Sequence, residues 1–72
     1  MSISAINVRN QFRGTIKEIN EGPVVSEIAV QAAGGIVVTS VITTRSIKEL
    51  GLSLGKEVVA LVKSTEVSIA TL

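Results

Sequence analysis

The chain has 72 residues, with seven Lys and Arg against six acidic residues and a net charge of +1. This length allows one domain, which we expect to span residues 1–72. The balanced charge and the single aromatic residue, Phe12, argue against nucleic-acid binding, which relies on basic surfaces and stacking side chains. Because the sequence has no Cys and no His, it has no disulfide framework and no plausible zinc or iron site.

Hydrophobic residues make up 46% of the chain, so the core is expected to consist of Val, Ile, Leu and Ala. A domain this short buries a modest part of its surface and is marginally stable alone. We therefore expect a homo-oligomer. No run approaches the ~20 apolar residues of a membrane helix, and residues 1–12 lack the pattern of a signal peptide. These features predict a cytoplasmic protein that does not bind membranes.

Short strand-like runs alternate with turn signals along the first half of the chain. Residues 12–19 alternate between apolar or small and polar side chains, which predicts a strand. Residues 20–23, "NEGP", predict a turn. Residues 24–31 and 36–43 predict two more strands, joined by a hairpin connection at 32–35, "AAGG". The third strand is apolar on both faces, so we expect it to be buried on both.

A short helix is predicted over residues 46–50. Ser46 is a suitable N-cap, and Glu49 three residues later completes a capping box. Gly51 suits the left-handed conformation that often ends a helix. We expect Leu52 and Leu54, which follow, to contribute to the core.

Two further strands are predicted, at residues 57–64 and 66–72. Five short strands with one helix between the third and fourth indicate an all-β fold, a small five-stranded barrel of the oligonucleotide/oligosaccharide-binding (OB) type. An open sandwich is the less favoured alternative.

Catalysis is difficult to build from this composition. The sequence has no His, Cys or Asp, so the usual pairs of base and nucleophile are absent. It contains neither a Gly-x-Ser-x-Gly elbow nor a Gly-x-x-x-x-Gly-Lys phosphate loop. We therefore expect a binding protein and not an enzyme.

Hydrogen-bond donors gather at the ends of the predicted elements. Thr43 and Ser46 flank the helix start, Lys63 and Ser64 end the fourth strand, and Arg9 precedes the first. Each has an ordinary structural explanation, as a helix cap or a solvated charge. If they converge, they form a pocket without carboxylates. Such a pocket suits a fully deprotonated tetrahedral oxyanion, such as molybdate, tungstate or sulfate, because that ion only accepts hydrogen bonds.

Residues 6–19, "INVRNQFRGTIKEI", and 42–65, "ITTRSIKELGLSLGKEVVALVKST", resemble the molbindins, which are small cytosolic molybdate-binding proteins of bacteria. The most specific parts are "VRNQFRG", "ITxxS", "LGLxxG" and "ALVKS", in the order and spacing of the family. The same domain occurs in molybdate regulators and transporter ATPases. The sequence departs from the family at Asn7 and Val8, where a Ser and an Ala are usual.

The resemblance implies an OB-like barrel that assembles as a hexamer, a trimer of dimers that exchange their first strand. It implies molybdate or tungstate as the ligand, bound between subunits for storage and homeostasis, with no organic cofactor. A regulatory or protein-interaction module that senses molybdate for a transporter or transcription factor is the alternative. Arg9 is expected to reach the anion from a neighbouring chain. The expected oxyanion-binding residues are Asn7, Val8, Arg9, Thr43, Ser46, Val62, Lys63 and Ser64.

Overall fold

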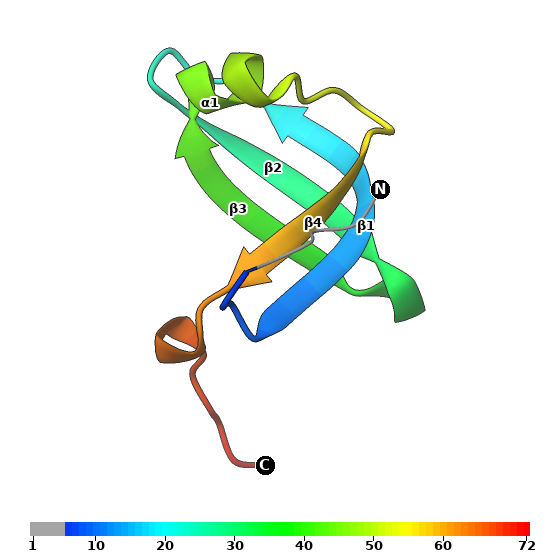
Figure 1. Cartoon of the computed structure of the whole chain (residues 1–72), viewed down its shortest axis with the longest axis vertical. Helices are drawn as coiled ribbons and strands as arrows, with labels where there is room; N and C mark the ends of the chain where they lie inside the picture. Colours follow the sequence, from blue (N-terminus) through cyan, green and yellow to red (C-terminus); the bar gives the residue numbers. More distant parts are fainter. Residues whose placement is uncertain (1–5) are drawn as a thin grey trace.

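In the computed structural model, which describes residues 6–72, an antiparallel four-stranded sheet curls around a small apolar core (Figure 1). The strands, in the spatial order β3-β2-β1-β4, are β1 (Asn10–Asn20), β2 (Val25–Ala32), β3 (Val37–Thr43) and β4 (Glu57–Val62). The helix α1 (Thr44–Leu50) lies between β3 and β4 in the chain, as predicted. Short 3-10 turns follow β2 and β4, at Ala33–Gly35 and Ser64–Glu66. Among the residues described, no helix is long and apolar enough to cross a membrane.

The predicted fifth strand, residues 66–72, does not form in this chain. After the turn at Ser64–Glu66, residues 67–72 have no strand assignment and extend away from the sheet (Figure 1). We call these residues the C-terminal tail; within it, Ile69 is 87% exposed. A strand needs a neighbouring strand that accepts hydrogen bonds from its N–H groups and donates hydrogen bonds to its C=O groups. The alternating sequence is present, but the tail pairs with none of the strands β1 to β4.

Strand β1 is the centre of the fold because it pairs with both β2 and β4. Phe12, Gly14 and Ile16 are more buried than the residues between them, as the alternation predicted. Gly14 allows a close approach of β2, since a Cβ atom there would lie 2.2 Å from the Gln31 carbonyl oxygen. A register shift after Ile16 bends the strand. The first half of β1 therefore pairs with β4 and the second half mainly with β2.

The core consists of aliphatic side chains, as expected: Ile16, Ile28, Val30 and Ile47 are buried. Leu52 packs against them, whereas Leu54, also expected in the core, is exposed. The prediction that the third strand is buried on both faces is wrong, because Val37 and Val41 are 48% and 66% exposed. Strand β3 lies at an edge of the sheet, and within residues 6–72 these side chains on its outer face stay exposed.

The helix begins two residues earlier than predicted, and its N-cap is Thr43 instead of Ser46. The Thr43 hydroxyl accepts a hydrogen bond from the Ser46 backbone N–H at 3.1 Å, which is the role of an N-cap side chain. The expected capping box does not form. Glu49 instead makes an ion pair with Arg45 one turn earlier, at 2.8 Å. Gly51 ends the helix with a φ of 63°, as predicted.

Candidate functional site

The start of β1 and the end of β4 bring several predicted site residues together. Asn10 is paired with Val62 at the end of the β1–β4 ladder, so the residues before Asn10 lie beside those after Val62. An open depression of about 480 Å³ lies between these two segments. Its lining residues are Asn7, Val8, Arg9, Lys63, Ser64 and Thr65. We call it the cationic depression. Thr65 was not among the predicted site residues. It could have been selected from the sequence because it directly follows Lys63 and Ser64.

The cationic depression contains two positive side chains and no carboxylate among its lining residues. Within residues 6–72, the ion pairs are Arg13–Glu57 and Arg45–Glu49, so neither Arg9 nor Lys63 has an acidic partner. Hydroxyl and amide donors from Ser64, Thr65 and Asn7 complete the lining. This composition suits an anion that accepts hydrogen bonds from every side.

Thr43 and Ser46 form a second group of donors at the start of α1. The two hydroxyl oxygens lie 2.7 Å apart, and the Thr43 oxygen also accepts from the Ser46 N–H. One hydroxyl proton is used between the two side chains, which leaves the other free to donate to a ligand. The backbone N–H of Thr44 donates to the Val24 carbonyl at 2.8 Å. The Thr44 and Ser46 N–H groups are therefore already used, whereas the hydroxyls of Thr43 and Ser46 can still offer a donor.

Thr44 and Ser26, which sequence reasoning did not select, hold this junction in place. Ser26 is 3% exposed, and its hydroxyl lies 2.7 Å from that of Thr44. Ser26 also accepts from the Gly22 N–H at 3.2 Å, while Thr44 donates to the Gly22 carbonyl at 2.6 Å. The network ties the β1–β2 turn to the β3–α1 junction. Nothing in the local sequence pattern marks Ser26, because its partners are distant in the chain.

The two donor groups lie at opposite ends of the sheet. Strand β4 is antiparallel to β1, and β3 runs in the same direction as β1 because both pair antiparallel with β2. The end of β3 therefore lies far from the start of β1 and the end of β4 (Figure 1). Within one chain, Thr43 and Ser46 therefore do not converge with Lys63 and Ser64. Arg9 shares an end with Lys63, so it does not need a neighbouring chain to approach that residue.

Arg13 provides a contrast to Arg9. It lies on the outer face of β1, and its guanidinium donates to the Glu57 carboxylate at 2.6 Å. That hydrogen bond, together with the charge of Arg13, holds the pKa of Glu57 below its ordinary value. Because both side chains are more than half exposed, the ion pair contributes little to stability.

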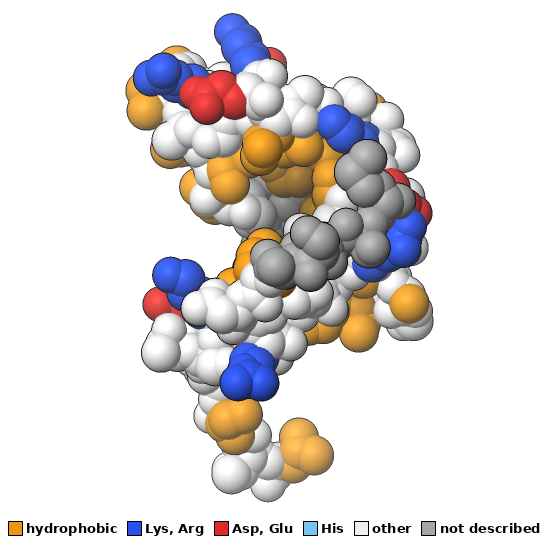
Figure 2. All heavy atoms as spheres, in the orientation of Figure 1, with side chains coloured by type: hydrophobic (Ala, Val, Ile, Leu, Met, Phe, Trp, Pro, Cys, Tyr) orange, Lys and Arg blue, Asp and Glu red, His pale blue; other side chains and the backbone are white. Residues whose placement is uncertain are grey.

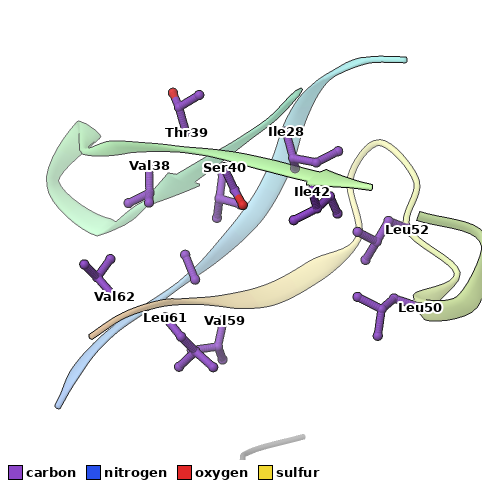
Figure 3. A pocket seen from close by; sticks show the side chains of 12 residues that line it. Ile28, Val38, Thr39, Ser40, Ile42, Leu50, Leu52, Val59, Leu61 and Val62 are labelled. Atoms are coloured by element: carbon purple, nitrogen blue, oxygen red, sulfur yellow. The ribbon is translucent and has the colours of Figure 1, made fainter. Parts of the chain in front are cut away.

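An apolar groove of about 250 Å³ runs between the two edge strands, β3 and β4, which are not paired with each other. In Figure 3, Val38, Ser40 and Ile42 point from β3 toward β4, whereas Thr39 points away. Leu50 and Leu52 close the end near α1. Figure 2 shows the same region as a hollow lined with hydrophobic side chains. A groove of this kind is unsuited to a small dianion but suited to another chain segment.

No group of three or more His, Cys, Asp and Glu that could hold a metal ion occurs within residues 6–72.

Comparisons with known proteins place this geometry in a family. The model of the TOBE domain matches residues 6–69. Molybdenum-pterin-binding protein 2 of Clostridium pasteurianum is 45% identical over 69 residues, which cover 96% of this chain and 97% of that protein.

Solved structures agree with the sequence match. The apo structure of MopII from Clostridium pasteurianum superposes with a TM-score of 0.89 at 40% identity, covering 93% of this chain and all of that one. The cytoplasmic molybdate-binding protein ModG, solved with molybdate bound, gives a TM-score of 0.83 at 34% identity, covering 86% of this chain and 44% of that one. The chain therefore belongs to the molbindin family, whose fold is the TOBE domain.

Proposed function

We propose that this protein binds molybdate without catalysing a reaction, as a cytoplasmic homo-oligomer with anion sites between its subunits. One observation carries the proposal: Arg9, Lys63 and Ser64 line a single depression that no carboxylate lines. A dianion there would receive charge-assisted hydrogen bonds, each contributing about 1.5–3 kcal/mol. A few such bonds offset the desolvation of the ion and leave useful affinity.

The chemistry of the donors favours molybdate or tungstate over phosphate. Near neutral pH phosphate keeps a proton, which is best placed beside a strong acceptor, and the depression has no carboxylate to receive it. Similar proteins are named for binding molybdenum-pterin or molybdate, which supports molybdate as the member of this class. Tungstate has the same charge and a similar shape, so it is expected to compete for the same site.

The separation of the two donor groups supports a site shared between chains. A single small ion cannot contact both ends of one sheet, so Thr43 and Ser46 of one chain would complete the coordination begun by Arg9 and Lys63 of another. The full set of proposed ligands is Asn7, Val8, Arg9, Thr43, Ser46, Val62, Lys63 and Ser64, with Val8 and Val62 contributing backbone only.

The groove and the tail support assembly. The apolar groove lies between two unpaired strand edges, and the C-terminal tail carries Val67, Ile69 and Leu72 as exposed side chains. We place the exchanged segment at this tail and not at β1, since β1 pairs on both sides within its own chain. A tail from a second chain, added between β3 and β4, would complete a five-stranded OB-like barrel.

Such exchanged dimers, three to a particle, would give the expected hexamer. A single domain of this family, spanning residues 1–72, would serve as each subunit and store the anion.

Native mass spectrometry of the purified protein with and without molybdate tests this proposal. The subunit mass is 7.5 kDa, so the mass of the intact particle divided by this value gives the number of chains. We expect a hexamer whose mass rises by whole numbers of molybdate ions, and no rise with phosphate at the same concentration. A monomer without bound anion at millimolar molybdate would contradict the proposal. A stable complex with another cellular protein that molybdate releases would favour a regulatory module instead.

A further inference from the structure

Two side-chain amides that follow Arg9 each bind a backbone carbonyl beside the cationic depression. The Gln11 amide donates to the Val8 carbonyl at 2.9 Å, which closes a short loop around Arg9 and Asn10. The Asn10 amide donates to the Val62 carbonyl at 3.1 Å, across from β1 to β4. One bond thus constrains the backbone before Arg9, and the other constrains the residue before Lys63.

Backbone pairing alone does not extend to the residues that line the depression. The pair Asn10–Val62 is the last of the β1–β4 ladder. Before it, residues 6–9 belong to no strand, and after it Lys63 leads into a 3-10 turn. The Asn10 side chain therefore adds a link where the ladder ends. Asn10 is partly buried, whereas Arg9 and Gln11 on either side of it are exposed, so this link is shielded from water more than those side chains are.

The link formed by Asn10 opposes the electrostatic repulsion between two nearby positive side chains. Arg9 and Lys63 line the same depression, and neither takes part in an ion pair among residues 6–72. Like charges in one depression repel each other, so without an anion the two segments gain by moving apart. Any free energy spent in bringing them together again on binding is lost from the affinity.

We propose that Asn10 is a positioning residue that holds the Arg9 and Lys63 segments together before the anion arrives. Gln11 has the supporting role of fixing the Val8 carbonyl. The inference rests on the proposed function, because it takes the cationic depression as part of the anion site. Asn10 itself does not line the depression, so it acts through its two neighbours.

The test compares Asn10→Ala with Asn20→Ala by calorimetric titration with molybdate. Asn20 is a matched control: it lies at the opposite end of β1, and its amide donates to Glu18 at 2.8 Å. Loss of one hydrogen bond of this kind is expected to weaken molybdate binding about five- to tenfold in Asn10→Ala. Asn20→Ala is expected to stay within about twofold of the unmodified protein, because that bond is exposed and remote. Equal affinities for both variants would overturn the proposal.

A double-mutant cycle separates positioning from general stability. If Asn10 acts through Arg9, the effect of Asn10→Ala should shrink to less than about twofold when Arg9→Ala is already present. Fully additive losses would overturn the positioning role. If Arg9→Ala alone leaves the affinity unchanged, the proposed anion site itself is wrong, which is a different outcome.

Gln11 provides a second variant in case Asn10→Ala does not fold. The Gln11 side chain is exposed, so Gln11→Met keeps the length of the side chain and removes only the donor to Val8. We expect a loss of molybdate affinity of about threefold with an unchanged melting temperature. An affinity equal to that of the unmodified protein, with a folded variant, would overturn the proposal that these side-chain amides position the anion-binding segments.

Discussion

Arg9 and Arg13 lie four residues apart and have different surroundings. Arg9 lines the cationic depression, whereas Arg13 is paired with Glu57 on the outer face of the sheet. We predict that Arg9→Ala weakens molybdate binding roughly 10- to 100-fold, since a charge-assisted hydrogen bond is worth about 1.5–3 kcal/mol. Arg13→Ala should change it by less than about twofold, because exposed ion pairs contribute little. Calorimetric titration measures both, and equal losses would exclude the site as described.

Ser26 is the buried polar residue on which the β1–β2 turn depends. Its hydroxyl accepts from the Gly22 N–H and contacts Thr44. We predict that Ser26→Ala lowers the free energy of unfolding by about 1–3 kcal/mol, because it leaves these groups without their partner. Ser53→Ala, on the exposed loop after α1, should have almost no effect. Urea denaturation followed by circular dichroism compares the two, and a stable Ser26→Ala variant would show that water replaces the hydroxyl.

Most residues of the proposed site could be selected from the sequence, but which of them lie together could not be predicted. Arg9, Lys63 and Ser64 could be selected because they stand at the ends of predicted strands and match motifs of the molbindins. Their proximity in one chain follows from the register of Asn10 with Val62, which no local pattern specifies. Ser26 could not be selected, since a serine within an alternating strand is ordinary until its partners Gly22 and Thr44 are known.

At the scale of the element, the junction between β3 and α1 serves both structure and binding. Thr43 caps the helix, and its hydroxyl contacts that of Ser46. We predict that Thr43→Ala lowers the free energy of unfolding by about 1 kcal/mol, the usual cost of losing an N-cap, and also weakens molybdate binding. Ser46→Ala removes a hydroxyl but keeps the cap, because the Ser46 backbone N–H remains.

The two variants therefore give different patterns. Thermal denaturation should show a lower melting temperature for Thr43→Ala than for Ser46→Ala, while calorimetric titration should show weaker binding for both. If Ser46→Ala binds molybdate normally, the hydroxyl contact belongs to Thr43 alone. If both variants bind normally, this end of the sheet is not part of the site.

The elements themselves were largely predictable. Alternation over residues 12–19 identified β1, and the turn residues at 20–23 and 32–35 separated the next two strands. The two errors, in the helix cap and in the burial of β3, both arise because local sequence does not specify tertiary contacts. The helix cap moved from Ser46 to Thr43 because both residues suit that position, and the burial of β3 was overestimated because an edge strand can expose apolar side chains.

At the scale of the whole molecule, residues 6–72 leave an open apolar groove and a C-terminal tail that pairs with none of β1 to β4. Ile69 is exposed in the single chain, so replacing it should not disturb the four-stranded body. We predict that Ile69→Lys reduces the number of subunits in the particle, because a charged side chain cannot be buried on a second chain without a partner. Ser68→Lys, on the neighbouring position of the same tail, should assemble normally.

Sedimentation velocity of both variants at micromolar concentration measures the assembly. Reduced assembly of Ile69→Lys alone would identify the tail as part of an interface. If Ile69→Lys keeps the full particle, the tail is not an assembly segment, and the groove must be covered in another way. If both variants assemble poorly, the added charge and not the lost apolar side chain is responsible.

By itself, the sequence determined the all-β class, the aliphatic core, the helix between the third and fourth strands, and a set of donors at the ends of these elements. Those features depend on alternation, turn residues and composition, which are local. Only the tertiary structure decided that the sheet has four strands, that Arg9 lies with Lys63, and that Thr43 and Ser46 lie at the other end. Strand order and register bring together residues that are far apart in the chain, and an alternating segment becomes a strand only where a partner edge receives its hydrogen bonds.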